Sequence, residues 1–123
     1  MAKFDHMMLP VADCDATCDW YVKNLGFKVE FEIAKARTVA IQDDAGFTIF
    51  LQETRKPIAG ERCALTMQVK DVDEVYRALS EKGVKFIHAP QKLFWGYGAE
   101  LADPDGYLVR LWDEVSMREK GSA

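Results

Sequence analysis

Two polar side chains and a run of aromatic rings in this sequence could act on a small molecule. His6 offers an imidazole near the N-terminus, and Arg110 offers a guanidinium near the C-terminus. A guanidinium is permanently charged and presents five N–H donors, so Arg110 could hold a carboxylate, an enolate or a polarised carbonyl. The segment LFWGYG at 93–98 adds three large rings whose rigid area suits stacking on a flat ligand. These residue types predict a binding site for a flat, partly polar organic compound.

The composition excludes several classes of protein. The 123 residues are 49% apolar and 29% charged, which suits one compact domain and neither a disordered tail nor a disulfide-dense mini-protein. A net charge of −4 argues against nucleic acid as a partner, because phosphate neutralisation needs a basic face. No apolar run reaches the roughly 18 residues of a membrane span, and Asp5 and Pro10 interrupt the stretch where a signal peptide needs an unbroken apolar core. We therefore expect a cytoplasmic protein that binds neither nucleic acid nor membrane.

An internal repeat organises the chain. The pattern Val-x-Asp-x-Asp at 11–15 recurs at 69–73, an offset of 58 residues, and a glycine after each pattern recurs at 26 and 83. Repeats of this kind indicate that one supersecondary unit is used twice. Two half-domains of about sixty residues follow, and neither is large enough to stabilise a core alone.

Each copy of the pattern opens a helix. In the second, Asp71 can cap the helix with Glu74 three residues on, and an apolar stripe at i, i+3, i+4 and i+7 runs toward Gly83. The first helix is expected to end at Gly26. Its predicted buried stripe comprises Cys18, Tyr21, Val22 and Leu25.

The cysteines are interpreted as structural. Cys14, Cys18 and Cys63 are odd in number and contain no CxxC pair, so neither a disulfide framework nor a zinc site is indicated. Under the 58-residue offset, Cys14 and Cys18 fall on the apolar residues Val72 and Tyr76. We therefore expect both thiols to pack in the core.

Strand patterns fill the rest of each half. Alternating apolar residues predict eight strands, and DDAG at 43–46 and DPDG at 103–106 have the composition of hairpin turns. The order is strand, helix and three strands, given twice. The expected fold class is α+β, with two βαβββ modules forming a curved mixed sheet, a concave pocket on one face and helices on the outer face.

Strand alternation separates the residues that face the helices from those that face the concave side. If Leu9, Ile49 and Val109 pack on the helices, their neighbours point the other way. The predicted concave-face residues are His6, Met8, Thr48, Phe50, Gln52, Ala64, Thr66, Gln68, Leu108, Arg110 and Trp112. Trp95 and Tyr97 are expected at the rim of the pocket. From this set we predict nine ligand-binding residues: His6, Thr48, Phe50, Gln52, Thr66, Trp95, Tyr97, Arg110 and Trp112.

Three segments of the chain resemble the vicinal oxygen chelate superfamily. They are FDHMMLPVADCDATCDWYVKNLGF, the second VKDVD, and FWGYGAELADPDGYLVRLWD, and the resemblance spans nearly all of residues 4–114. The superfamily comprises glyoxalase I, bleomycin-resistance proteins and extradiol dioxygenases. The resemblance implies paired βαβββ modules and an intertwined homodimer with pockets at or near the interface. We expect one domain at 1–115, with modules at about 1–56 and 60–115, and a flexible tail at 116–123.

In metal-using branches of the superfamily, four side chains hold the cation, and the matching positions here are His6, Phe50, Ala64 and Arg110. Only His6 is a ligand type, and a divalent ion needs at least three protein donors. A guanidinium also repels a divalent cation. The resemblance therefore points to the metal-free, bleomycin-resistance-like branch, with no metal and no cofactor, although a shifted strand register would bring in Gln52 or Glu53.

Alternatives remain open for the individual residues. Arg110 could either hold a ligand in place of the metal charge or be paired structurally with a carboxylate such as Asp5 or Glu100. His6 could be a hydrogen-bonding wall or a catalyst. His88 carries no motif and is given no role.

The preferred functional reading is a metal-free protein that sequesters a small molecule, as in antibiotic resistance, with no catalytic residue. Arg110 favours a ligand with an anionic or carbonyl group, whereas the acidic net charge favours a cation; the local charge outweighs the net charge for a buried contact. The first alternative is a metal-dependent lyase, isomerase or dioxygenase. Metal-free acid–base chemistry and a pocket without function are two further possibilities.

Overall fold

The computed structural model describes residues 1, 3–55 and 64–122. By its internal contacts the chain forms two compact units, Met1–Ala59 and Gly60–Ala123. Cys63 and the expected module boundary at 56–60 lie outside the described residues.

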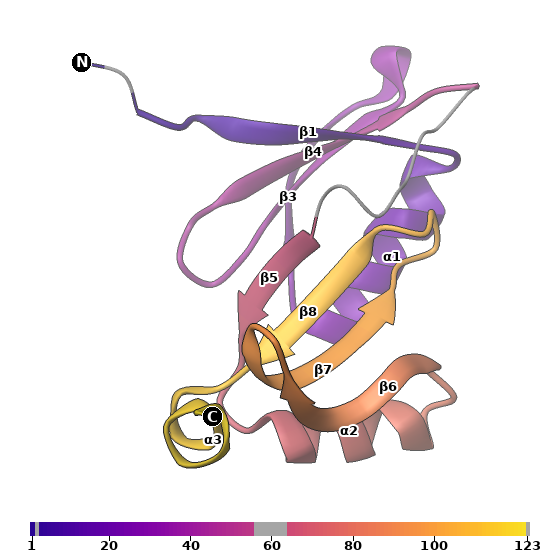
Figure 1. Cartoon of the computed structure of the whole chain (residues 1–123). Helices are drawn as coiled ribbons and strands as arrows, with labels where there is room; N and C mark the ends of the chain where they lie inside the picture. Colours follow the sequence, from indigo (N-terminus) through magenta and orange to yellow (C-terminus); the bar gives the residue numbers. More distant parts are fainter. Residues whose placement is uncertain (2, 56–63, 123) are drawn as a thin grey trace. The chain divides into compact units, whose positions relative to one another are not determined.

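The first unit contains a four-stranded sheet and the helix α1 (Figure 1). The elements in chain order are β1 (His6–Val11), α1 (Cys14–Leu25), β2 (Lys28–Ile33), a 3-10 turn (Ala34–Ala36), β3 (Thr38–Gln42) and β4 (Thr48–Glu53). The strand order is β1-β4-β3-β2, with β1 parallel to β4 and the other neighbours antiparallel. Helix α1 packs on β3 and β4, so one face of the sheet is core and the other carries no helix of this unit among the described residues.

The second unit repeats this arrangement. Its elements are β5 (Ala64–Gln68), α2 (Val72–Glu81), β6 (Phe86–Leu93), β7 (Gly96–Ala102), β8 (Leu108–Trp112) and α3 (Glu114–Lys120). The strand order β5-β8-β7-β6 is the same order with the same single parallel pair. Figure 1 shows α2 running beside β6, which it contacts together with β7. The predicted α+β class with two βαβββ modules is confirmed.

The turn and cap signals lie where the sequence placed them. The Asp13 side chain accepts hydrogen bonds from the backbone of Asp15 and Ala16, and the Asp71 side chain accepts one from Glu74. Gly26 ends α1 in the left-handed conformation, with φ at 74°. Both helices therefore begin at a capping aspartate, which was predicted for Asp71 alone.

The predicted stripe of α1 needs a correction. Cys14, Thr17, Cys18 and Tyr21 are buried, at the spacing i, i+3, i+4 and i+7. Val22, expected in the core, is 37% exposed. The apolar pattern misplaced the stripe because one of its positions is the polar Thr17. The burial of Cys14 and Cys18 is confirmed, and burial raises the pKa of both thiols.

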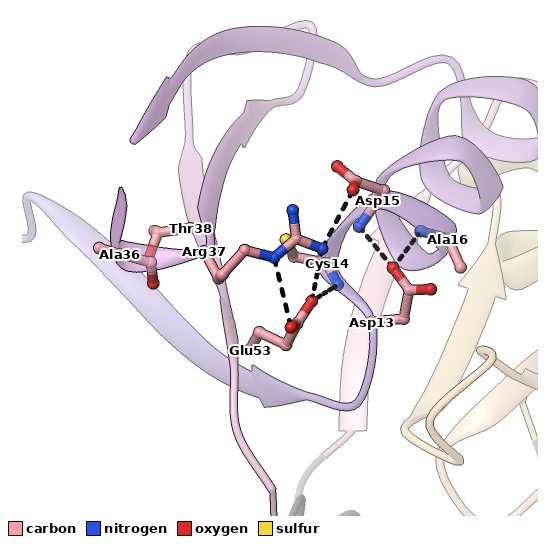
Figure 2. Close-up of polar contacts among 8 residues, drawn as sticks. All are labelled: Asp13, Cys14, Asp15, Ala16, Ala36, Arg37, Thr38 and Glu53. Atoms are coloured by element: carbon pink, nitrogen blue, oxygen red, sulfur yellow. Dashed lines mark hydrogen bonds and ion pairs between the residues drawn. The ribbon is translucent and has the colours of Figure 1, made fainter. Parts of the chain in front are cut away.

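A carboxylate at the end of the last strand of each module anchors the start of that module's helix. The Glu53 Oε2 atom accepts a hydrogen bond of 3.2 Å from the Cys14 backbone, and the Asp113 Oδ2 atom accepts one of 2.7 Å from Val72. Arg37 bridges Glu53 to Asp15 in the first unit, as Figure 2 shows. Both modules thus join the end of the last strand to the start of the helix by a carboxylate. A carboxylate is favoured there because helix N-termini attract negative charge.

The expected flexible tail at 116–123 is wrong for its first residues. Residues 114–120 form α3, which packs on β7. Asp113 caps this helix by accepting a hydrogen bond of 2.7 Å from the Ser116 backbone. The tail MREKGSA looks frayed in sequence because the residue that starts the helix lies before it.

No helix in the described part of the chain is long and apolar enough to cross a membrane.

Candidate functional site

Four polar side chains form a row across the second sheet. Strand register pairs Thr66 with Arg110, Arg110 with Glu100, and Glu100 with His88, so one residue comes from each of β5, β8, β7 and β6. The alternate residues Leu101, Val109 and Leu111 are fully buried on the other face. We call Thr66, Arg110, Glu100 and His88 the polar row.

Glu100 is the centre of the polar row. Its Oε2 atom accepts a hydrogen bond of 2.9 Å from Arg110 Nε, and its Oε1 atom lies 2.8 Å from His88 Nε2. The side chains of Glu100, His88 and Arg110 are only 14%, 17% and 20% exposed. Burial acts to raise the pKa of Glu100, but the contacts with His88 and Arg110 outweigh it and lower that pKa. Arg110 is therefore paired with Glu100 and not with Asp5, the other partner that the sequence left open.

Aromatic rings cover the guanidinium of Arg110. Its Cζ atom lies 4.7 Å from the ring centre of Trp95 and 5.9 Å from that of Phe94. The Trp95 ring lies over Gly98, where an added Cβ would be 2.5 Å from Trp95 Cη2 and would also overlap the carbonyl oxygen of Leu111. Gly98 therefore allows Trp95 to approach the sheet beside Arg110.

Trp95 also carries an unsatisfied buried donor. Its Nε1 atom is buried and has no hydrogen-bond partner within the described structure. A buried N–H without an acceptor is costly, and such groups occur where a ligand or water completes them. Trp95 thus packs beside Arg110 with one polar atom unpaired among the described residues.

The matching face of the first sheet is mainly apolar. Register aligns Met8, Phe50, Ala40 and Phe31 across β1, β4, β3 and β2. His6 stacks on Phe50 with ring centres 3.8 Å apart, and Phe31 meets Phe50 edge to face at 5.5 Å. His6 Nδ1 lies 2.8 Å from the exposed carboxylate of Asp5. On this face, His6 therefore packs its imidazole against the Phe50 ring.

A small polar cluster adjoins these rings. Thr48 donates a hydrogen bond of 2.8 Å to Glu30 Oε2, and Gln42 Nε2 donates to Thr48 at 3.2 Å. Glu30 reaches this face at the bulge between Val29 and Phe31. Sequence alternation missed Glu30 because a bulge changes the phase of the strand.

Most predicted binding residues lie on the helix-free faces. In the first unit His6, Thr48 and Phe50 lie together, and Gln52 follows in phase on β4. In the second unit Thr66, Trp95 and Arg110 lie together, and Trp112 follows in phase on β8.

Tyr97 departs from its expected place at the pocket rim. It belongs to β7, and its hydroxyl donates a hydrogen bond of 2.9 Å to Asp73 of α2, on the face opposite Arg110. LFWGYG is a tight turn leading directly into a strand, so Tyr97 alternates with Gly98.

Sequence reasoning missed His88 and left Glu100 as one of two options. The DPDG turn contained the signal for Glu100, since counting outward from it along β7 and β8 pairs Glu100 with Arg110. The position of His88 depends on two register shifts in β6, and Pro90 signals only the second of them, between His88 and Gln91.

Comparison with known proteins identifies the family. A sequence model of the Glyoxalase/Bleomycin resistance protein/Dioxygenase superfamily matches residues 3–111, and the chain belongs to this superfamily. The superfamily recognised from the sequence is thereby confirmed, whereas its metal-free branch stays a prediction. No curated protein sequence matches the chain.

Several solved structures are similar to this one. A member of the same superfamily from Sphaerobacter thermophilus is 28% identical, with a TM-score of 0.77, covering 93% of this chain and 98% of that one. A possible glyoxalase from Bacillus cereus is 19% identical, with a TM-score of 0.76, covering 90% and 98%. A glyoxylase/bleomycin resistance protein/dioxygenase domain from Frankia is 21% identical, with a TM-score of 0.72, covering 90% and 96%. The last two likenesses concern the fold alone.

The residues at the superfamily's metal positions do not suit a divalent ion. Phe50 and Ala64 have no donor atom, and Arg110 is a cation whose charge would repel a metal. Within the described residues, no three His, Cys, Asp or Glu side chains are grouped closely enough to hold a metal. The side chains that the structure describes at these positions therefore do not fit the superfamily's usual ion.

Proposed function

We propose that this chain is a metal-free small-molecule-binding protein that holds a flat organic ligand with an anionic or carbonyl group, and that the second sheet provides the anchoring contact. Superfamily membership supports small-molecule binding as the class of function. The donor chemistry at the metal positions supports the metal-free form. The proposed activity is stoichiometric sequestration, as in antibiotic resistance.

The observation that carries this proposal is the guanidinium of Arg110 lying on the ring of Trp95. The hydrogen bond that Arg110 makes within the described residues uses Nε. The edge formed by Nη1 and Nη2 is left for a planar acceptor, such as a carboxylate or a carbonyl. Trp95 supplies ring area beside the guanidinium.

Tryptophan fluorescence tests the proposal. The intact protein is titrated with planar aromatic acids, amides and amines, and we expect at least one to bind with a Kd below about 1 mM. Trp95→Phe and Arg110→Met should each weaken that binding about tenfold, because each removes one side of the contact. Trp20→Phe, in α1, is the matched control and should leave affinity unchanged.

Three results would overturn the proposal. The first is the absence of binding across the panel, and the second is equal weakening of binding by Trp20→Phe and Trp95→Phe. The third is about one equivalent of nickel, zinc, manganese or iron per chain in protein purified without chelator, which would favour the metal-dependent enzymes of the superfamily.

A further inference from the structure

The polar row holds a second basic side chain, His88, whose geometry restricts its protons. Its Nε2 atom lies 2.8 Å from a carboxylate oxygen of Glu100, and its Nδ1 atom lies 2.8 Å from the carbonyl oxygen of Ala89. Carbonyl and carboxylate oxygens only accept hydrogen bonds. Each ring nitrogen of His88 therefore faces an oxygen that can accept a hydrogen bond, so the geometry provides an acceptor on both sides of the ring.

This geometry changes the charge balance around Arg110. Glu100 alone would neutralise Arg110, and its carboxylate would repel an anionic ligand at the same place. With His88 as imidazolium, the three side chains together carry one positive charge. The ionisable groups facing His88 within the described residues are Glu100 on β7 and, beyond it, Arg110 on β8. Helix α2 packs on the opposite face, where Tyr76 meets Phe86.

We infer that His88, acting through Glu100, makes this subsite select a planar carboxylate over the matching neutral amide. The inference rests on the proposed function, because it concerns the same ligand site. His88 is a positioning residue rather than a contact residue, since both of its nitrogens are occupied. It offsets the charge of Glu100, which in turn fixes Nε of Arg110 and leaves the Nη1–Nη2 edge for two parallel hydrogen bonds to the carboxylate.

Benzoate and benzamide are suitable probes, because they have nearly the same shape and differ in charge. Affinities are measured by tryptophan fluorescence for the intact protein and three variants. We expect benzoate to bind at least about tenfold more tightly than benzamide, since charge-assisted hydrogen bonds are roughly twice as strong as neutral ones. His88→Gln should reduce this preference about tenfold and leave benzamide binding unchanged.

Two further variants separate charge from fold. His88→Lys keeps a positive charge beside Glu100 and should retain the preference for benzoate. Lys85→Gln removes one positive charge from an exposed residue just before β6 and should change neither affinity. A merely structural role for His88 predicts instead that both probes weaken together in His88→Gln and His88→Lys.

The outcomes distinguish the two proposals. If both probes bind equally in the intact protein, or if His88→Gln keeps the preference, the inference about His88 is wrong and the proposed function stands. If neither probe binds while other panel compounds bind through Arg110, carboxylate selection is wrong. If no compound binds at all, the proposed function fails first.

Discussion

Gly98 is the residue on which the approach of Trp95 to the sheet depends. An added methyl group would meet both the Leu111 carbonyl oxygen and the Trp95 ring, and a strand backbone cannot move cheaply. We therefore expect Gly98→Ala to lower the free energy of unfolding by about 1–3 kcal/mol. Urea denaturation measures the loss, and a change in tryptophan emission should accompany it.

Gly83→Ala is the comparison for this effect. An added methyl group at Gly83 would have open space around it, and the cost would come only from its φ of 88°. That strain is expected to cost about 1 kcal/mol. A Gly98→Ala protein as stable as the wild type would show that Trp95 does not pack as described.

At the level of single residues, strand alternation predicted the face on which a side chain lies but not the residue with which it pairs. Alternation placed Arg110 on the helix-free face, and the structure confirms this. Its carboxylate partner was left open between Asp5 and Glu100, because a partner depends on the register of another strand. His88 was missed for the same reason, since two register shifts set its position in β6.

The start of α3 depends on a single carboxylate that serves two helices. Asp113 Oδ2 accepts from the Val72 backbone of α2, and Oδ1 accepts from Ser116 of α3. An amide has one oxygen and can replace only one of these contacts. We expect Asp113→Asn to lower the free energy of unfolding by about 1–2 kcal/mol, measured by urea denaturation.

Asp71→Asn is the matched substitution at a simpler cap. Asp71 accepts one backbone hydrogen bond, from Glu74, and asparagine caps helices about as well as aspartate. This variant should change stability by less than about 0.5 kcal/mol. Equal losses in the two variants would mean that the second contact of Asp113 adds nothing.

Tyr97 links β7 to α2 and makes the second unit sensitive to high pH. Burial, the hydrogen bond to Asp73 and nearby carboxylates raise the pKa of Tyr97 to about 12. In the unfolded chain a tyrosine ionises near pH 10. The stabilising effect of the neutral hydroxyl is therefore complete below about pH 10 and is lost as the pH rises toward 12.

Urea unfolding between pH 8 and 11 measures this loss. We expect the free energy of unfolding to fall above about pH 10 in the wild type and to fall less steeply in Tyr97→Phe. Tyr76→Phe is the control, because its ring contact with Phe86 does not require the hydroxyl. Identical slopes in all three proteins would contradict the assignment of the effect to Tyr97.

The elements themselves were predictable where their signals are local. The cap at Asp71 indicated α2, the glycines at 26 and 83 indicated the ends of both long helices, and turn sequences indicated the hairpins. Helix α3 was missed because it is short and depends on contacts with β7, which are not local in sequence. Tyr97 was predicted to lie in a loop because its segment contains two glycines. The turn before it is short, and Tyr97 already belongs to β7.

At the scale of the whole molecule, the two repeats share a backbone plan and differ in the chemistry of one row. The polar row Thr66, Arg110, Glu100 and His88 has its counterpart in Met8, Phe50, Ala40 and Phe31. The same strand order thus supports a charged surface in one unit and an apolar one in the other. Function here is determined by side chains on a repeated scaffold and does not follow from the fold.

Both repeats also depend on carboxylates that must stay ionised, which predicts sensitivity to acid. Contacts with Arg37 and the Cys14 backbone lower the pKa of Glu53. The pKa values of Glu100 and Asp113 are lowered despite burial, because hydrogen bonds to the charged form outweigh it. Their stabilising effect is complete above the unfolded pKa values of about 4 and is lost as the pH falls through the lower folded values.

We therefore expect the free energy of unfolding, measured in urea from pH 7 to pH 2.5, to be nearly constant down to about pH 5 and then to decrease. Glu100→Gln should make that decrease shallower, because one titrating group is gone, whereas Glu81→Gln, at an exposed position near the end of α2, should not. If stability were unchanged down to pH 2.5, the carboxylates would not be held in their charged form by the contacts described. If Glu100→Gln kept the wild-type slope, Glu100 would not contribute to the acid sensitivity. The sensitivity would then come from Glu53 and Asp113, which anchor the helix starts.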